Sequence, residues 1–150
     1  MPYKTTSLKT KDNEGKWIII DAKNETLGRL ASDIAMILRG KTHAGFTPHA
    51  DTGPSIIVIN SKQIRVTGKK VKDKMYLHHT GWMGGLKSIA YGDLFKKDPT
   101  LPLLKAVKGM LPKNPMGRSL LTKLRIFPAH HHLHEAQMPQ KYKITKHVQG

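Results

Sequence analysis

The sequence contains no cysteine among its 150 residues. This absence excludes a disulfide scaffold, a zinc finger with cysteine ligands and catalysis by a thiol. Acidic residues are scarce, with 10 Asp and Glu against 26 Lys and Arg, and no apolar run approaches the ~20 residues that a helix needs to span a bilayer. Residues 1–16 mix basic and acidic side chains without an apolar segment, so we expect neither a secretory signal nor an organelle transit peptide.

The charge balance points to a polyanionic partner. The formal net charge is +16, and it rises along the chain, from +3 in residues 1–50 to +5 in 51–98 and +8 in 99–150. A folded domain of this charge repels itself unless a polyanion neutralises it, and nucleic acid is the partner that this pattern predicts. The length fits a single domain.

The first half of the chain predicts a βαβ unit. Residues 17–22 and 55–60 are continuous β-branched runs, which are typical of strands covered on both faces. Between them, helix-start residues at 24–26 precede apolar residues at spacings of three and four over 27–38, and Gly40 suits the end of that helix. A strand, an amphipathic helix and a strand in this order predict parallel strands with a right-handed crossover.

Shorter elements follow in the second half. We predict a strand at 75–79, helices at 91–97, 100–111 and 115–122, and a last strand at 124–127. Residues 63–67 fit either a short strand or a turn of helix. The third helix of the chain carries an apolar stripe that should pack on the sheet, formed by Leu103, Leu104, Val107 and Leu111. Residues 128–150 have weak periodicity and predict an extended tail.

Two short motifs resemble catalytic ones in an unsuitable context. Gly40-Lys41-Thr42 matches the end of a phosphate-binding loop, but it follows a helix instead of opening one. Asp51-Thr52-Gly53 matches the triplet of aspartic proteases, but Pro54 follows it and predicts a turn. We therefore expect no catalytic residues and no nucleotide cofactor.

Histidines and glycines offer further candidates. The cluster His130-His131-His132 with His134, and the pair His78-His79, lack the fixed spacing of zinc sites, so we expect no metal centre. These histidines can instead contact phosphates or bases. The glycine-rich loop 80–85, with Trp82 and the nearby Lys87, could approach a phosphate closely; an ordinary loop between two strands is the alternative interpretation.

Several blocks occur together in a distinctive order. They are residues 17–41, 46–53, 58–60, 66–70, 73–74, 78–81, 84–85, Val107-Lys108-Gly109-Met110-Leu111-Pro112 with its preceding Ala106, and Gly117-Arg118. This ordered set resembles the ribosomal protein L13 family of the large subunit, in its bacterial form, over about residues 16–127. Phe46 stands where that family usually has Tyr, and Ala129 where it usually has Gly, Asp or Asn.

The resemblance implies a fold and a function. The implied fold is α/β, with three α/β/α layers around a mainly parallel four-stranded sheet. The chain then divides into a basic N-terminal arm at 1–15, a single RNA-binding domain at 16–127 and an extended tail at 128–150. The implied function is that of a cytoplasmic, non-enzymatic constituent of the large ribosomal subunit, which binds 23S-type RNA, contacts neighbouring ribosomal proteins and acts early in assembly. No membrane partner and no small-molecule substrate are expected.

Basic and histidine side chains spread along this domain are the predicted RNA contacts. They are Arg29, Arg39, Lys41, His49, Arg65, Lys69, Lys70, Lys72, Lys74, His78, His79, Lys87, Lys105, Lys108, Lys113, Arg118, Lys123 and Arg125. A small hydrolase using His78, His79 and Asp51 is an alternative from another class, but these residues lie on different segments with no activated nucleophile beside them. A DNA-binding protein is a third possibility, although no helix-turn-helix or basic-zipper pattern supports it.

Overall fold

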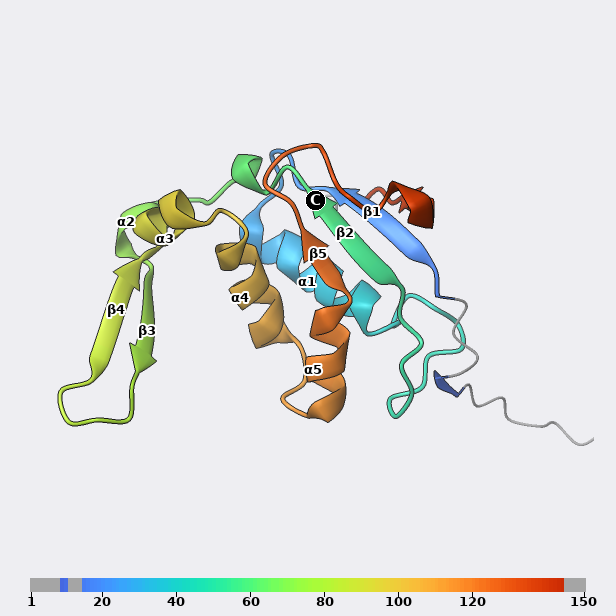
Figure 1. Cartoon of the computed structure of the whole chain (residues 1–150), viewed down its shortest axis with the longest axis horizontal. Coiled ribbons are helices and arrows are strands. Elements are labelled where there is room, and N and C mark those ends of the chain that lie inside the picture. Colours follow the sequence, from blue (N-terminus) through green and yellow to red (C-terminus); the bar gives the residue numbers. More distant parts are fainter. Residues whose placement is uncertain (1–8, 11–14, 145–150) are drawn as a thin grey trace, which may run out of the picture.

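A parallel sheet of four strands lies at the centre of the computed structural model, which describes residues 9–10 and 15–144 (Figure 1). Most of the predicted N-terminal arm and the end of the predicted tail lie outside the described residues. The strands are β1 (Trp17–Asp21), β2 (Ser55–Ile59), β5 (Leu124–Ile126) and β6 (Gln140–Lys141), in the order β5-β2-β1-β6. All three pairings are parallel.

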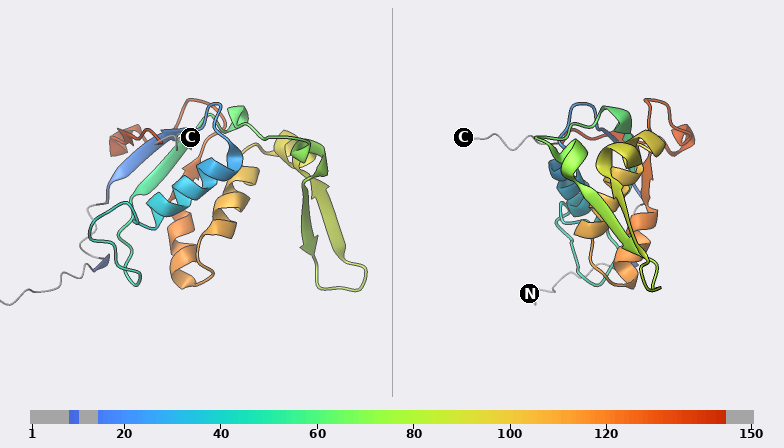
Figure 2. Two further views of the ribbon diagram at one scale, coloured as in Figure 1. Left: turned by 180° about the vertical axis from the view of Figure 1, so that it is seen from behind. Right: turned by 90° about the vertical axis from the view of Figure 1, so that its left-hand side faces the viewer.

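Helices cover one face of this sheet (Figures 1 and 2). They are α1 (Leu27–Leu38), α4 (Leu101–Met110) and α5 (Pro115–Thr122), whereas α2 (Lys70–Asp73) and α3 (Tyr91–Lys97) lie away from the sheet (Figure 1). Helix α1 joins β1 to the parallel β2, which confirms the predicted βαβ unit. Helices α4 and α5 lead to β5 at the edge of the sheet, and α4 packs along α1.

The core lies between this helical layer and the sheet. Ile20 of β1 and Val58 of β2 are neighbours in register and are fully buried beneath Ile34 of α1. From the predicted stripe on α4, Leu103 and Val107 are fully buried in the same core, as expected. The other two members of the stripe differ slightly, since Leu111 is buried while Leu104 is half-buried at the edge of the core.

The segment 128–139 covers the opposite face of the sheet. Its helical turn is a single 3-10 turn, η3 (Glu135–Gln137). The ring of His134 lies 5.5 Å from the Trp17 ring and 5.8 Å from the Phe127 ring, so the predicted histidine cluster contributes to packing here. The α/β fold around a parallel four-stranded sheet is therefore confirmed, and a largely irregular segment, not an α-helix, lies on this second face.

Part of the predicted tail belongs to the sheet. Gln140 and Lys141 pair with Ile18 and Ile19 of β1 as strand β6. The backbone N–H of Tyr142 then donates a hydrogen bond of 2.9 Å to the carbonyl oxygen of Ile19. Hydrogen bonds thus attach this part of the tail to the open edge of β1.

A β-hairpin projects from the body of the molecule (Figures 1 and 2). It consists of β3 (Met75–His79), as predicted, and β4 (Leu86–Ala90), which pairs with it in antiparallel fashion. The loop 80–85 therefore joins two strands. Upstream of the hairpin, the ambiguous stretch 63–67 continues from a 3-10 turn, η2 (Ser61–Gln63), into extended backbone that forms an isolated bridge with Thr26.

Candidate nucleic-acid interface

Nearly all the predicted RNA contacts lie at the surface. Only Arg39 and Lys123 are half-buried, and the rest of the predicted set is exposed. Exposure is required for contact with phosphate, but it is also what an ordinary charged surface shows. The informative question is therefore which of these side chains the fold brings together.

A groove follows the seam between α1 and α4, beginning at the N-terminal end of α1. Here a hollow of about 450 Å³ is lined by two predicted contacts, Lys70 and Lys74, and by Asp73. Its other walls come from the start of α1, from the stretch after β2 and from α4, and they are Thr26, Leu27, Gly28, Val66, Thr67, Ala106 and Met110. Cations at this end face the first turn of α1, where the helix dipole also favours negative charge.

The groove continues to the C-terminal end of α1. A second hollow, of about 340 Å³, is lined there by Arg39 and Lys41 together with Ser32, Ala35, Met36 and Met110. Met110 of α4 lines both hollows. Arg39 follows Gly28 by eleven positions, a rise of about 16 Å at 1.5 Å per residue, so the two hollows lie near opposite ends of α1. We call these two hollows together the α1–α4 groove.

A smaller hollow lies on the other side of α4. The α4–α5 hollow has a volume of about 200 Å³ and brings together three predicted contacts, Lys108, Lys113 and Arg118. Its remaining lining is Leu111, Pro112, Gly117 and Leu121. Three cations around an apolar floor offer phosphate contacts at the rim and space for a flat or apolar group between them.

The turn between α4 and α5 is closely packed. Pro112 ends α4, and the Asn114 side chain caps α5 by accepting a 2.8 Å hydrogen bond from the Gly117 N–H. A side chain at Gly117 would collide with the carbonyl oxygen of Pro112. This glycine therefore lets the turn close and sets Lys113 and Arg118 on the same hollow. Gly109 differs, because an added Cβ there has no neighbour within 4 Å.

Lys105 and Lys74 meet at the base of the hairpin. Their ammonium groups lie 4.9 Å and 5.5 Å from the centre of the Tyr76 ring, within cation–π range. Burial raises the pKa of Tyr76. The pKa of Tyr91 is raised mainly by burial and secondly by repulsion from the negative charge that Tyr76 carries when it is ionised, so both phenols stay neutral at physiological pH. These contacts tie the hairpin to α4 and hold two predicted RNA contacts in place.

Lys123 has a partner inside the protein. Its Nζ lies 2.6 Å from Oδ2 of Asp51 and donates a 3.1 Å hydrogen bond to the carbonyl oxygen of Gly53. The two charged side chains are 24% and 13% exposed, so water screens this ion pair only partly. The pair attaches the loop before β2 to the loop before β5, and the contact of Lys123 with RNA stays a prediction.

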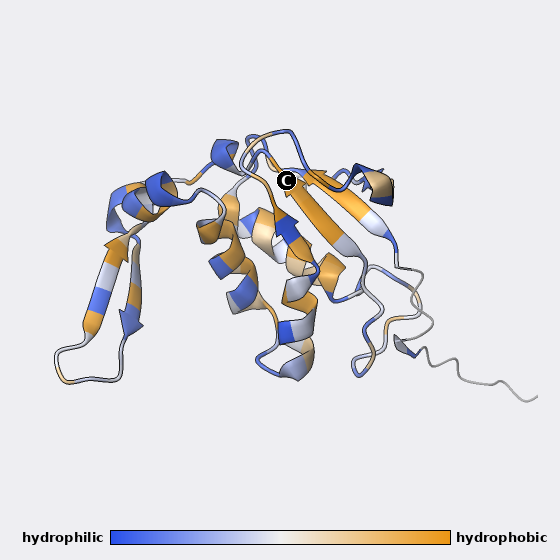
Figure 3. Ribbon diagram, viewed as in Figure 1, coloured by the Kyte–Doolittle hydropathy of each residue, from blue (hydrophilic) through white to orange (hydrophobic). Residues whose placement is uncertain are grey.

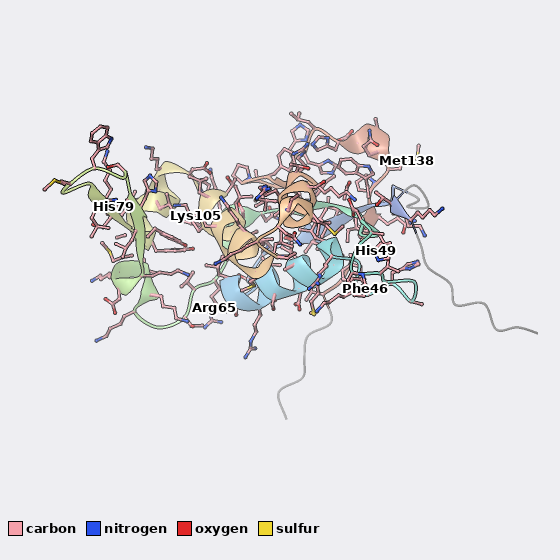
Figure 4. The ribbon with its side chains drawn as sticks, turned by 90° about the horizontal axis from the view of Figure 1, so that it is seen from below. Phe46, His49, Arg65, His79, Lys105 and Met138 are labelled. Atoms are coloured by element: carbon pink, nitrogen blue, oxygen red, sulfur yellow. The ribbon has the colours of Figure 1, made fainter. Side chains whose placement is uncertain are left out.

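Other predicted contacts lie away from these three hollows. Arg125 alternates with the buried Leu124 along β5, which directs it to the sheet face opposite the helices. His49 lies at one end of the molecule and His79 at the other (Figure 4). Arg29, Arg65, Lys69 and Lys72 are exposed and line none of the three hollows. The predicted set thus covers several surfaces, with its densest grouping around α4.

The hairpin carries His78, His79 and Lys87. His78 lies directly opposite Lys87, while His79 lies opposite Leu86 on the other face. Both histidines are exposed. Near the other end of the molecule, Arg39 stacks its guanidinium 5.7 Å from the Phe46 ring, a contact that spacing alone did not reveal.

The catalytic alternatives receive no support from the geometry. Asp51 pairs with Lys123 near the sheet, whereas His78 and His79 lie on the projecting hairpin. Within residues 9–10 and 15–144, no group of histidine and acidic side chains is arranged to hold a metal ion. No helix in the same part of the chain combines the length and apolar character that crossing a membrane requires.

Comparison with known proteins gives a consistent result. The family model described as ribosomal protein L13 matches residues 15–133. A protein of Teredinibacter turnerae, named large ribosomal subunit protein uL13, is 50% identical over 94% of this chain and 99% of its own length. Proteins of the same name from Vesicomyosocius okutanii and Pseudomonas aeruginosa are 52% and 50% identical over the same shares.

Proposed function

The chain belongs to the ribosomal protein L13 family, and from this premise we propose that it binds the 23S-type RNA of the large ribosomal subunit through the surface around α4. As a member of this family it is a constituent of the large subunit and not an enzyme. Its place is the ribosome, which in bacteria lies in the cytoplasm.

One observation carries the RNA-binding proposal. Seven cations line the hollows on the two sides of α4, and they are Arg39, Lys41, Lys70, Lys74, Lys108, Lys113 and Arg118. Asp73 is the acidic residue among the side chains that line these hollows. Phosphate backbones bind to such grouped cations, with Arg providing a bidentate fork and Lys a point charge.

Assembly and protein partners form the rest of the proposal. A chain of charge +16 that attaches to RNA through several segments can hold those RNA segments together before other proteins arrive. We therefore expect it to act early in assembly of the large subunit and to contact neighbouring ribosomal proteins. The other predicted contacts, including Arg125 on the opposite sheet face and His49 at one end of the molecule, are candidates for further RNA segments.

Filter binding to transcribed 23S-type RNA tests the proposal. The variant Lys108→Ala/Arg118→Ala removes two cations from the α4–α5 hollow without touching the buried core. We expect its thermal midpoint to be unchanged and its RNA affinity to fall. The slope of log K against log salt should become shallower by about 0.7–0.9 for each lost phosphate contact.

A matched variant controls for charge alone. Lys96→Ala/Lys97→Ala removes two exposed cations from the last turn of α3, outside the lining of all three hollows. It should bind RNA more tightly than Lys108→Ala/Arg118→Ala. Equal affinity of the two variants would contradict the assignment of the α4 surface, and failure of the unmodified chain to bind would contradict RNA binding itself.

A further inference from the structure

The end of the hairpin is an ordered turn. The Thr80 N–H donates a 3.0 Å hydrogen bond to the Gly85 carbonyl oxygen, and the Gly85 N–H donates a 2.9 Å hydrogen bond to the Trp82 carbonyl oxygen. Gly81 and Gly84 have φ values of 91° and 69°, which residues with side chains rarely adopt. This backbone fixes the two residues between these glycines, Trp82 and Met83, at the apex.

Both apical side chains are open to solvent. Trp82 is 80% exposed and Met83 is fully exposed, although Trp is normally among the more buried residue types. The surface continues on one face of the hairpin with Leu77 and Leu86, which are 65% and 62% exposed. Colouring by hydropathy shows both apolar and polar positions on the two strands (Figure 3). Apolar surface presented in this way is typical of a binding site.

The two faces of the hairpin have different surroundings. Tyr76 and Ile89 are opposite each other and half-buried, and the Tyr76 ring receives Lys105 from α4. On the other face, Leu77 and Leu86 are both exposed. Contact with the body therefore holds one face and leaves the second face and the apex available to a partner.

Charge identifies the class of partner. No acidic residue occurs between Asp73 and Asp93, while Lys74, His78, His79 and Lys87 all lie in that stretch. The core of a contact between proteins is usually depleted in charged residues, which lie at its polar rim. An exposed indole beside cations and without carboxylates is instead the combination that binds unpaired nucleotides, by stacking on the base and neutralising its phosphates.

We propose that the apex of the hairpin holds an unpaired nucleotide of the large-subunit RNA, with the Trp82 indole stacked on the base and Lys87 beside the phosphate. This inference rests on the proposed function, because it requires RNA next to the hairpin. It adds a contact of a different kind from the cationic hollows at α4. Stacking depends on base exposure and releases no counterions, whereas the hollows act through charge.

Tryptophan fluorescence gives a direct test. The chain has two tryptophans, and Trp17 lies half-buried on β1 against His134. The variant Trp17→Phe isolates the Trp82 signal, and Trp82→Phe provides the Trp17 background if Trp17→Phe folds poorly. On titration with transcribed 23S-type RNA, we expect quenching of Trp82 and its protection from acrylamide.

Measurements of RNA affinity provide the second part of the test. Trp82→Ala should weaken RNA binding by about 5- to 150-fold, the range for loss of one stacked base, and should leave the salt slope unchanged. Trp82→Phe should retain most of the affinity, because it keeps an aromatic face. Lys87→Ala should instead make the slope shallower by about 0.7–0.9. Met83→Ala is the matched control, since it removes an exposed apolar side chain at the same apex.

Each contrary outcome has a distinct meaning. If RNA binds with unchanged affinity while Trp82 stays accessible to acrylamide, the inference is wrong and the proposed function stands. If Trp82→Ala and Met83→Ala bind RNA normally but both lose a neighbouring ribosomal protein from assembled particles, the occupant is a protein and the inference is again wrong. If the unmodified chain binds no RNA, both the inference and the proposed function are wrong.

Discussion

Replacing Gly109 by alanine should stabilise the protein, whereas the same replacement at Gly117 should destabilise it. Gly109 is the penultimate residue of α4, and an added Cβ there meets no heavy atom within 4 Å. Alanine in a helix is favoured over glycine by about 0.5–1 kcal/mol, because glycine loses more conformational entropy. For a chain of this size, that gain corresponds to a rise in Tm of about 1–4 °C.

At Gly117 the helix preference is outweighed by packing. The new Cβ would meet the Pro112 carbonyl oxygen, which is backbone and cannot rotate away. The turn would have to open, and the hydrogen bond that the Gly117 N–H donates to Oδ1 of Asn114 would weaken with it. Overpacking costs about 1–3 kcal/mol and loss of a cap about 1 kcal/mol, so after the helix gain we expect a net loss of about 1–3 kcal/mol.

Urea unfolding of the three proteins at one temperature measures both effects. The midpoints should move in opposite directions, with the slope of free energy against urea unchanged. Destabilisation by Gly109→Ala, or a neutral or stabilising Gly117→Ala, would show that the described turn and helix end do not control stability as argued. Gly109→Ala should also weaken RNA binding if RNA approaches the α4 backbone beside Lys108, a result that stability alone would not produce.

Further predictions concern the core, the internal ion pair and pH. Leu103→Ala should lower the free energy of unfolding by about 2–5 kcal/mol in denaturant titration, since this fully buried side chain lies in the main core. Lys123→Ala should cost about 1–3 kcal/mol in the same assay because Asp51 loses its cation, whereas Arg125→Ala should stay within about 0.5 kcal/mol. Hydrogen bonds from the hydroxyl and N–H of Thr100 lower the pKa of Asp98, so its contribution is complete above the unfolded pKa of about 3.9 and is lost as pH falls through the lower folded value. Unfolding between pH 7 and pH 2 should therefore show a smaller acid-dependent loss in Asp98→Asn than in the unmodified chain, and equal losses would contradict this assignment.

The sheet was predictable where its strands carry a strong pattern. Residues 17–20 and 56–59 are continuous apolar runs, because both faces of the sheet are covered, by α1 on one side and by the segment 128–139 on the other. Strand β6 was missed because Gln140 and Lys141 are polar and pair through backbone groups alone. Backbone pairing of so short a strand leaves no side-chain pattern to read.

The candidate interface was predictable in its chemistry more than in its arrangement. Charge alone identified Lys70 and Arg39, but only the packing of α4 along α1 places them on one groove. Sequence also identified Lys123 as a cation, without indicating that Asp51 from a distant loop reaches it. Both outcomes depend on contacts between remote segments, which local patterns do not encode.

The position of β6 beside β1 has a consequence for how the chain is made. Strand β1 forms early in synthesis, but its neighbour on one side is Gln140–Lys141, far downstream. Until that segment leaves the exit tunnel, the edge of β1 has unpaired N–H and C=O groups beside Ile18 and Ile19, and such edges favour pairing with other chains. A nascent chain that is released or cleaved before β6 emerges should therefore aggregate more readily than one that extends beyond it.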